Sequence, residues 1–341
     1  MRRFKNTASR IFSISLKRLL LCVRLVRKES KKPGLFIFLD MLFCYLRYGT
    51  GYLDYLTFGF YKQDKAKRKT FMNMNQNLAL VRKLNPSDFR GVLDNKLAFN
   101  HHFSALLKRE YLDLNQAGLE AFENFLKEKT HVFVKQTDGF GGKGVERVDV
   151  PEQDGINSLY GYLKQKNFLV VEQEIIQHPE MDKLSDSSVN SIRITTLEKN
   201  DEIHIVYALV RMSDGVGFVD NISSGGMYCP VDSSGTITAP AFCDLTGEYY
   251  ETHPKTHTVF VGFKIPFFLE ATLMVEQAAR MTPLTRYVGW DVAITRDGPA
   301  LIEGNSIPGY DMCQNYRHLN TEKTGILPRF KDILKDEFPV K

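Results

Sequence analysis

The clearest pattern along the chain lies between residues 131 and 304, where short apolar runs of strand length follow one another. They predict strands at 131–136, 145–150, 168–173, 191–197, 203–212, 288–295 and 299–304. Helical spacing of apolar residues predicts helices near 116–128, 156–166 and 266–281. Because helices and strands alternate irregularly and tight turns join several strand pairs, the fold class expected is α+β with mainly antiparallel sheets.

The first third of the chain has a different pattern. Residues 1–32 predict a basic amphipathic helix, which would either contact an anionic membrane surface or pack on its own domain with its charges solvated. Residues 35–61 are rich in aromatic side chains and predict helical core. Residues 62–115 predict charged, mostly helical segments with a break at Asn85-Pro86-Ser87.

Charge is placed unevenly over the 341 residues. Residues 1–33 hold eleven Lys and Arg and one acid, a net +10, so the rest of a chain of net charge +5 carries −5. This mildly acidic body argues against a general nucleic-acid binder, and we expect no nucleic-acid partner. Five scattered cysteines without a CxxC pair fit a reducing compartment and argue against structural zinc. No apolar run reaches the ~18–20 residues of a membrane span, and no secretory signal is expected.

A glycine-rich loop links two of the predicted strands. The first strand ends at Lys135 and the second begins at Val145, and the loop between them holds Gly139, Gly141, Gly142, Lys143 and Gly144. Glycines let the backbone approach a ligand and point successive N–H groups at phosphate oxygens. The spacing is that of neither a Walker P-loop nor a Rossmann fingerprint. The loop is therefore a candidate phosphate site, the alternative being a glycine-rich hairpin without a ligand.

A hairpin over 288–304 carries the candidate metal ligands. We expect a three-residue loop, Arg296-Asp297-Gly298, which sets Thr295 opposite Pro299 and Asp291 opposite Glu303. Asn305 then shares the face of Glu303, while Val292, Ile294 and Ile302 face the apolar side. A two-residue turn would put the two acids on opposite faces. Two carboxylates and an amide oxygen suit Mg²⁺, and the alternative is a solvated polar face.

These features occur in an order that resembles the ATP-grasp superfamily, and more narrowly its sugar-transfer-associated family. The narrower resemblance is carried by short motifs: Asp54-Tyr55-Leu56, Phe58-Gly59-Phe60-Tyr61, Asn95-Lys96-Leu97, Val171-Glu172-Gln173, Gln177-His178-Pro179, Ser188-Val189-Asn190-Ser191-Ile192-Arg193, Ser224-Gly225-Gly226 and Glu303-Gly304-Asn305-Ser306-Ile307-Pro308-Gly309. The resemblance implies two α+β lobes that clasp ATP, preceded here by a mostly helical segment. That segment differs from the α/β substrate lobe of relatives such as D-alanine–D-alanine ligase, so no substrate is carried over.

The resemblance also implies roles for single residues. Lys96 and Lys135 would contact ATP, and the loop at Gly139–Gly144 would fold over the phosphates. The linker Glu172, Gln173, Glu174 and Ile175 would meet adenine, with either Glu172 or Glu174 on the ribose. Arg193, Lys135 and Lys143 would act in catalysis, Asn221 would lie near the metal and acceptor, and Asp291, Glu303 and Asn305 would hold Mg²⁺ or Mn²⁺.

The function that follows is an ADP-forming ligase of surface polysaccharide or capsule modification. ATP would phosphorylate a carboxylate, and an amine would attack the acyl-phosphate to give an amide. Phosphoryl transfer to a hydroxyl and a non-catalytic, membrane-associated module are the alternatives. We expect a cytoplasmic protein with peripheral contact to the inner face of the membrane through residues 1–33. The expected divisions are 1–33, 34–115, a small lobe at 116–175 and a large lobe at 176–335.

Overall fold

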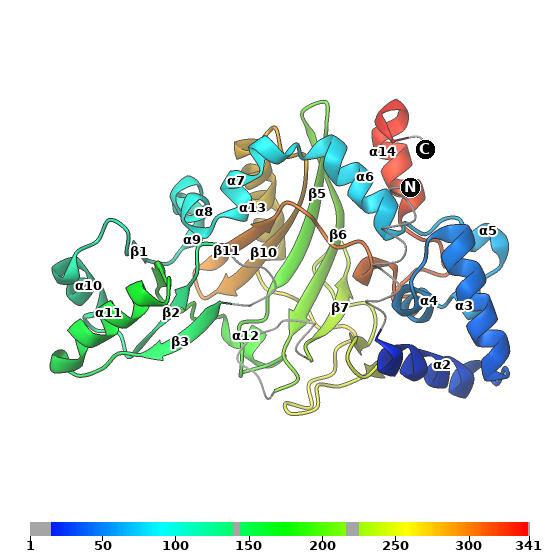
Figure 1. Cartoon of the computed structure of the whole chain (residues 1–341), viewed down its shortest axis with the longest axis horizontal. Coiled ribbons are helices and arrows are strands. Elements are labelled where there is room, and N and C mark those ends of the chain that lie inside the picture. Colours follow the sequence, from blue (N-terminus) through cyan, green and yellow to red (C-terminus); the bar gives the residue numbers. More distant parts are fainter. Residues whose placement is uncertain (1–14, 139–143, 216–224, 340–341) are drawn as a thin grey trace. The chain divides into compact units, whose positions relative to one another are not determined.

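The computed structural model describes residues 15–138, 144–215 and 225–339 (Figure 1). The chain forms two compact units. Unit 1 comprises residues 1–78 and 310–332, and unit 2 comprises residues 79–309 and 333–341. Two of the sequence positions at which the units divide fall within α6 (Met74–Leu84) and α14 (Leu327–Leu334). None of the helices in the described ranges combines the length and the apolar character that crossing a bilayer requires.

Unit 1 is helical. It contains α2 (Leu16–Ser30), α3 (Gly34–Tyr48), α4 (Tyr52–Thr57), η1 (Phe60–Lys62), α5 (Lys65–Arg68) and η5 (Met312–Gln314). An aromatic cluster fills its interior, with the rings of Phe58 and Phe71 stacked at 5.0 Å. Gly59 lies at φ +62°, where a Cβ would collide with the Tyr316 ring. The aromatic motif around Phe58-Gly59-Phe60 therefore builds the core of this unit.

The two N-terminal helices depart in part from their predicted environment. On α2, Cys22 and Val26 are buried, so the apolar side of this part of the predicted 1–32 helix packs on its own unit, as the second alternative expected, while residues 1–14 lie outside the described ranges. The aromatic segment is helical as predicted, but α3 buries only one side, with Ile37, Met41 and Cys44 inward. The prediction of core was therefore wrong for the outer half of α3, which is exposed.

Unit 2 holds a small, four-stranded antiparallel sheet in the order β1-β4-β2-β3. Its strands are β1 (Tyr111–Asp113), β4 (Val170–Glu172), β2 (His131–Lys135) and β3 (Val145–Asp149). The helices α10 (Leu119–Leu126) and α11 (Ile156–Gln165) share an apolar core with this sheet, as the periodicity predicts. One end of β2 and the start of β3 bring Lys135 to the edge where the glycine loop begins.

A second, seven-stranded antiparallel sheet has the order β11-β10-β5-β6-β7-β8-β9. Its strands are β5 (Ile192–Lys199), β6 (Glu202–Met212), β7 (Met227–Val231), β8 (Ala241–Cys243), β9 (Glu248–Tyr250), β10 (Tyr287–Thr295) and β11 (Gly298–Asn305). One face is apolar and packs against α13 (Phe268–Met281). Because strand side chains alternate, the opposite face receives Arg193 and Asp291.

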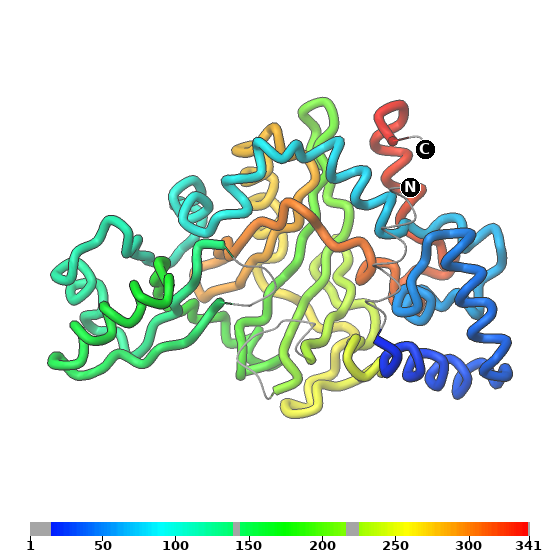
Figure 2. The backbone as a smooth tube through the Cα atoms, in the orientation of Figure 1, coloured from blue at the N-terminus to red at the C-terminus, as the bar shows by residue number. Residues whose placement is uncertain are grey.

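Short helical elements connect these parts. Figure 2 shows that the segment with α7 (Gly91–Asp94), α8 (Lys96–His102) and α9 (Ser104–Leu107) runs along β11. The remaining elements are η2 (Ser87–Phe89), η3 (Gln153–Gly155), α12 (Pro179–Asp182) and η6 (Lys335–Glu337). All seven predicted strands are present, which confirms the α+β class. Sequence patterning missed β1, β7, β8 and β9. Three of these strands, β1, β8 and β9, span only three residues, which is too short for a pattern of alternation.

Candidate active site

The hairpin of β10 and β11 brings Asp291 opposite Glu303, as predicted, but by a different geometry. Thr295 pairs with Gly298, so the loop has two residues and the predicted pairing with Pro299 is wrong. A bulge between Asp291 and Val292 then leaves Ile302 without a partner in the hairpin and shifts the register by one residue. The shorter turn and the bulge offset each other at Asp291, so this residue still faces Glu303. Ile302 does not face the predicted apolar side and instead lines a cleft that is described below.

Two arginines converge on the buried Asp291. The guanidinium of Arg193 on β5 donates through Nε to Oδ1 and through Nη2 to Oδ2, the latter at 2.9 Å. Arg211 on β6 forms a second ion pair with Oδ2 at 2.9 Å and donates to the Ser191 hydroxyl at 2.7 Å. Burial opposes ionisation, yet the charges of Arg193 and Arg211 hold the pKa of Asp291 well below its usual range. Asp291 is thus an ionised anchor for both arginines.

Gly289 provides the space for Arg193. It lies two residues before Asp291 on the same strand face, and a Cβ at this position would stand 3.2 Å from Arg193 Cδ. That separation is closer than ordinary van der Waals contact. A larger residue would therefore displace the arginine side chain.

Glu303 and Asn305 complete a group of oxygen ligands. The Asn305 amide lies 3.3 Å from Glu303 Oε1 and 3.5 Å from Asp291 Oδ2. Burial and the adjacent Asp291 charge raise the pKa of Glu303. A half-turn of the Asn305 amide would present its oxygen beside the two carboxylates. Two carboxylates and one amide oxygen form a hard donor set that fits Mg²⁺ or Mn²⁺ with its remaining positions open.

A second buried carboxylate, Glu172, lies at the end of β4. It accepts from Arg109 at 2.9 Å, from Lys135 at 2.6 Å and from Asn100 at 2.8 Å. Burial alone would raise the pKa of Glu172, but the charges of Arg109 and Lys135 hold it well below its usual range. Arg109 also donates to the Leu301 carbonyl oxygen at 2.6 Å. It therefore joins the small sheet to β11, two residues before Glu303.

Lys96 lies at the first turn of α8, where the Asn95 side chain caps the helix by accepting from Leu97 N and Ala98 N. Burial lowers the pKa of Lys96. A cavity of about 40 Å³ is lined by Lys96 together with Lys135, Glu172, Glu303 and Asn305. The structure thus brings together both predicted lysines and two of the three predicted metal ligands.

A larger cleft of about 520 Å³ runs past these groups. This volume is within the range of small-molecule sites. Its lining includes the linker from Glu172 to Gln177, the pair Arg193 and Arg211, and the three predicted metal ligands. Glu174 lines the cleft, and its Oε2 lies 2.8 Å from Nε2 of His131. Of the two linker acids, Glu172 is therefore buried in ion pairs with Arg109 and Lys135, whereas Glu174 is half-exposed.

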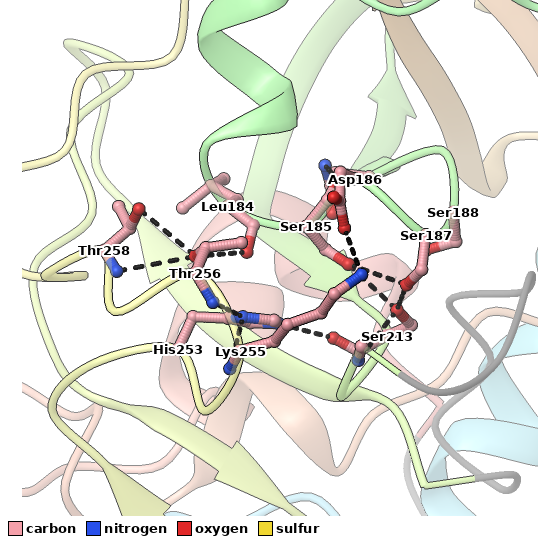
Figure 3. A network of polar contacts seen from close by, with 12 residues as sticks. Leu184, Ser185, Asp186, Ser187, Ser188, Ser213, His253, Lys255, Thr256 and Thr258 are labelled. Carbon is pink, nitrogen blue, oxygen red and sulfur yellow. Dashed lines mark hydrogen bonds and ion pairs between the residues drawn. The ribbon is translucent and has the colours of Figure 1, made fainter.

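Asp186, Ser187, Ser188 and Val189 also line the cleft, and hydrogen bonds and an ion pair hold the segment that contains them. The hydroxyls of Ser185, Ser187 and Ser213 contact one another, and Lys255 pairs with Asp186 at 2.8 Å (Figure 3). The Gln177 side chain donates to the Ser185 and Ser188 carbonyl oxygens. Ser188 is only 8% exposed, lines the cleft, and its hydroxyl has no hydrogen-bond partner among the residues described.

Several predicted residues lie outside the described ranges: Gly139, Gly141, Gly142, Lys143, Asn221 and Ser224. Gly144, at the end of the glycine loop, is described and lies at φ +72°. Its backbone oxygen accepts from Gln136 N at 3.0 Å, which closes the loop at its base. A Cβ there would stand 2.8 Å from the Gln136 side chain.

Sequence reasoning missed Arg109 and Arg211. Arg211 occupies a position on β6 that faces away from the apolar core, as the alternation of Ala208, Val210 and Met212 inward could have indicated. Arg109 follows Lys108 and precedes Glu110, so in the sequence it resembles an exposed charge cluster. No local pattern marks it as the buried partner of Glu172.

Comparison with known families decides the assignment. The model of the sugar-transfer associated ATP-grasp family matches residues 75–333. This chain belongs to that family. The match covers both sheets and all the described candidate site residues, whereas the motifs at residues 54–61 precede it. No curated protein matched the chain.

Three of the solved structures with a similar fold are an ATP-grasp ligase and two synthetases. The ligase PsnB with its minimal precursor is 13% identical, with a TM-score of 0.44 over 74% of this chain and 63% of that chain. The D-cycloserine synthetase DcsG is 16% identical, with a TM-score of 0.42 over 73% and 71%. D-alanyl-alanine synthetase A from Vibrio cholerae is 12% identical, with a TM-score of 0.43 over 72% and 66%.

Among these, PsnB has been solved with Mg and ADP and with AMPPNP. The present chain spans 63% of the length of the first PsnB structure. Likenesses as distant as these carry no conclusion about the substrates of this chain.

Proposed function

We propose that this protein is an ATP-dependent, ADP-forming ligase that activates a carboxylate as an acyl-phosphate and joins it to an amine. The observation that supports this most is the convergence of unlike charges on one cleft. Lys135 and the arginines Arg193 and Arg211 line it together with the oxygen ligands Asp291, Glu303 and Asn305. This arrangement suits an anionic phosphate group that is held by cations and by a bound metal.

The nucleotide occupies the linker side of the cleft in this proposal. Bound Mg·ATP, with Mn²⁺ as an alternative metal, would supply the phosphoryl group. Lys96 and Lys135 hold its phosphates, and the backbone of Gln173 and Ile175 meets the adenine. We assign Glu174 to the ribose, because its carboxylate lines the cleft while Glu172 is held by Arg109 and Asn100. The glycine loop with Gly139, Gly141, Gly142 and Lys143 would cover the phosphates.

Arg193 positions the carboxylate and the phosphate during transfer. Its guanidinium is permanently charged and can bind two oxygens at once. Because Asp291 accepts from both Nε and Nη2 of Arg193, the side chain is already oriented before a substrate arrives, and Arg211 also pairs with Asp291 through Oδ2. Fixed charge placed where negative charge develops lowers the barrier without reorganisation.

The acceptor occupies the part of the cleft that Asp186, Ser187, Ser188 and Val189 line. Three of these four residues have polar side chains. Such a lining suits a polyhydroxylated molecule. It supports an acceptor that is a saccharide or is attached to one, and hence a role in surface polysaccharide or capsule modification.

The test is product formation from Mg·ATP with candidate uronic acids or other carboxylates and amines. The expected result is ADP release that depends on both acceptors, with an amide identified by mass spectrometry. A phosphoester product would instead make the protein a phosphotransferase. Failure to bind Mg·ATP at all would leave only a non-catalytic module.

A peripheral, cytoplasmic position at the inner face of the membrane completes the proposal. The net +10 of residues 1–33 supports attraction to anionic lipid, at roughly 1 kcal/mol per basic residue near the surface. Since such attraction is electrostatic, it should weaken as salt rises.

A further inference from the structure

Helix α3 exposes an apolar surface over half of its circumference. Ile37, Met41 and Cys44 form its buried side. The helical period places its large exposed apolar side chains on the other half: Leu35, Phe36, Phe38, Leu39, Leu42, Phe43, Tyr45 and Leu46. Leu35 is 70% exposed and Leu46 is 74% exposed. A helix that is apolar all round normally lies in an apolar environment, and a patch of this kind marks a contact surface.

Basic residues precede this surface in the chain. Residues 15–33 contain seven Lys and Arg against one acid, Glu29. Arg24, Arg27 and Lys28 on α2 are exposed. Lys31 and Lys32 lie between the end of α2 at Ser30 and the start of α3 at Gly34.

The acids of α2 and α3 are neutralised within unit 1. Glu29 pairs with Lys62, and Asp40 on α3 pairs with Arg68 at 2.7 Å and accepts from the Tyr55 hydroxyl at 2.7 Å. The two helices therefore present an apolar face together with the exposed cations Arg24, Arg27 and Lys28, which form no ion pair with any acid among the described residues.

We propose that α3 is a membrane-docking helix that lies in the plane of an anionic lipid bilayer. Its apolar half enters the headgroup and acyl-chain boundary, while the cations of α2 and of the Lys31-Lys32 link contact anionic headgroups. With 15 residues, α3 is shorter than a spanning helix. This inference rests on the proposed membrane contact of residues 1–33 and changes its mechanism. The apolar side of α2 is buried in the unit, so α3 supplies the insertion.

Charge favours lipid over a second copy of the chain as the occupant. A symmetric pair joined through α3 would bring two identical basic α2 helices near one another. Like charges placed together across an interface oppose association. An anionic bilayer instead offers the opposite charge beside an apolar layer.

The experiment is co-sedimentation of the full-length protein with two kinds of vesicle. One contains phosphatidylcholine alone, and the other also contains phosphatidylglycerol. The apolar variant combines Leu35→Gln, Leu39→Gln and Leu46→Gln. All three sites are exposed, and glutamine is a good helix former. The matched control combines Leu269→Gln, Leu273→Gln and Leu284→Gln, whose side chains are 68%, 56% and 53% exposed in unit 2.

The wild-type chain and the control should bind the anionic vesicles alike. The apolar variant should bind at least about tenfold more weakly, because three leucines no longer leave water. Thermal melts of all three proteins report whether the substitutions disturb the fold. Equal binding by the apolar variant and the control would overturn the inference.

A charge variant separates this inference from the proposal on which it rests. Arg24→Gln, Arg27→Gln and Lys28→Gln together should weaken binding most at low salt. If the charge variant loses binding while the apolar variant does not, the proposed membrane contact of residues 1–33 is supported and the insertion of α3 is contradicted. If the wild-type chain binds neither kind of vesicle, both proposals are contradicted. A dimer that dissociates in the apolar variant, seen by analytical ultracentrifugation, would make a second copy the occupant and would also overturn the inference.

Discussion

Two buried carboxylate clusters of unit 2 differ in how their charges balance. At Glu172, one carboxylate faces two cations, Arg109 and Lys135, and its pKa is lowered against the effect of burial. At the hairpin, two carboxylates lie together, and both Arg193 and Arg211 are bound to Asp291. The pKa of Glu303 is raised by burial and by its neighbour.

The difference suggests what each cluster can accept. The first has a cation in excess, and Lys135 faces the cleft, so it suits an anion such as phosphate. The second has a carboxylate whose charge is poorly tolerated, so it suits a metal ion. Placed side by side on the cleft, a phosphate-accepting cluster and a metal-accepting cluster make the pair that a metal-bound nucleotide requires.

The largest expected effect comes from breaking the first cluster. Arg109→Met leaves Glu172 charged and less compensated in a buried position, and it should lower the free energy of unfolding by about 3–5 kcal/mol. Chemical denaturation measures this. The control Arg280→Met removes an exposed arginine on α13 and should change stability by less than about 0.5 kcal/mol. Equal stability of both variants would mean that Glu172 does not depend on Arg109.

Glu303→Gln tests the second cluster. The substitution removes the poorly tolerated charge, so we expect unchanged or higher thermal stability without metal. It should also lower the rate of ADP formation by about 10²–10³-fold, since it weakens metal binding at the reacting phosphate. Retention of full turnover would exclude Glu303 as a metal ligand. Glu180→Gln, at an exposed surface pair with Lys183, is the control and should leave the rate unchanged.

Gly289→Ala tests the second cluster through its arginine, Arg193. A Cβ placed 3.2 Å from Arg193 Cδ should displace the guanidinium and cost about 1–3 kcal/mol of stability, with roughly a tenfold loss of rate. Gly161→Ala is the matched control, because it lies in α11 with open space around the new methyl group. It should be neutral or stabilising by up to about 1 kcal/mol. Identical rates for the two variants would contradict the role of Gly289.

The smallest expected effect is a pH dependence of metal stabilisation. Because the pKa of Glu303 is raised, the folded chain retains that proton to a higher pH than the unfolded chain does. Its contribution to stability therefore falls as the pH rises above the ordinary glutamate value. Mg²⁺ displaces the proton, so the rise in Tm on adding Mg²⁺ should grow over the same pH range. A rise independent of pH, or one retained in Glu303→Gln, would place the metal elsewhere.

Much of this arrangement can be predicted from sequence where the signal is local. The alternation of a strand over 191–197 puts Arg193 on the face opposite Ile192 and Ile194, and a lysine that ends a strand before a glycine loop marks Lys135. The bulge at Asp291 and Val292 could not be predicted, because it depends on pairing across two strands rather than on either strand's pattern. The predicted facing of Asp291 and Glu303 was correct only because the bulge compensates for a shorter turn.

Long-range contacts limited the prediction elsewhere. Arg109 is separated from Glu172 by 63 residues and from the Leu301 carbonyl by 192 residues, and its sequence neighbours are charged. Apolar content alone likewise led to a wrong prediction for α3, whose outer half is exposed and not part of the core. A helix built from Leu, Phe and Tyr resembles core in sequence, and only its surroundings show which half is buried.

The central claim, that the two clusters together bind a metal-bound nucleotide, is tested most directly by titration calorimetry with a non-hydrolysable ATP analogue. The account predicts one site per chain that requires Mg²⁺ and is lost in Lys135→Met and in Glu303→Gln, each of which alters one cluster. Binding that persists in both variants, or that does not need Mg²⁺, would contradict it.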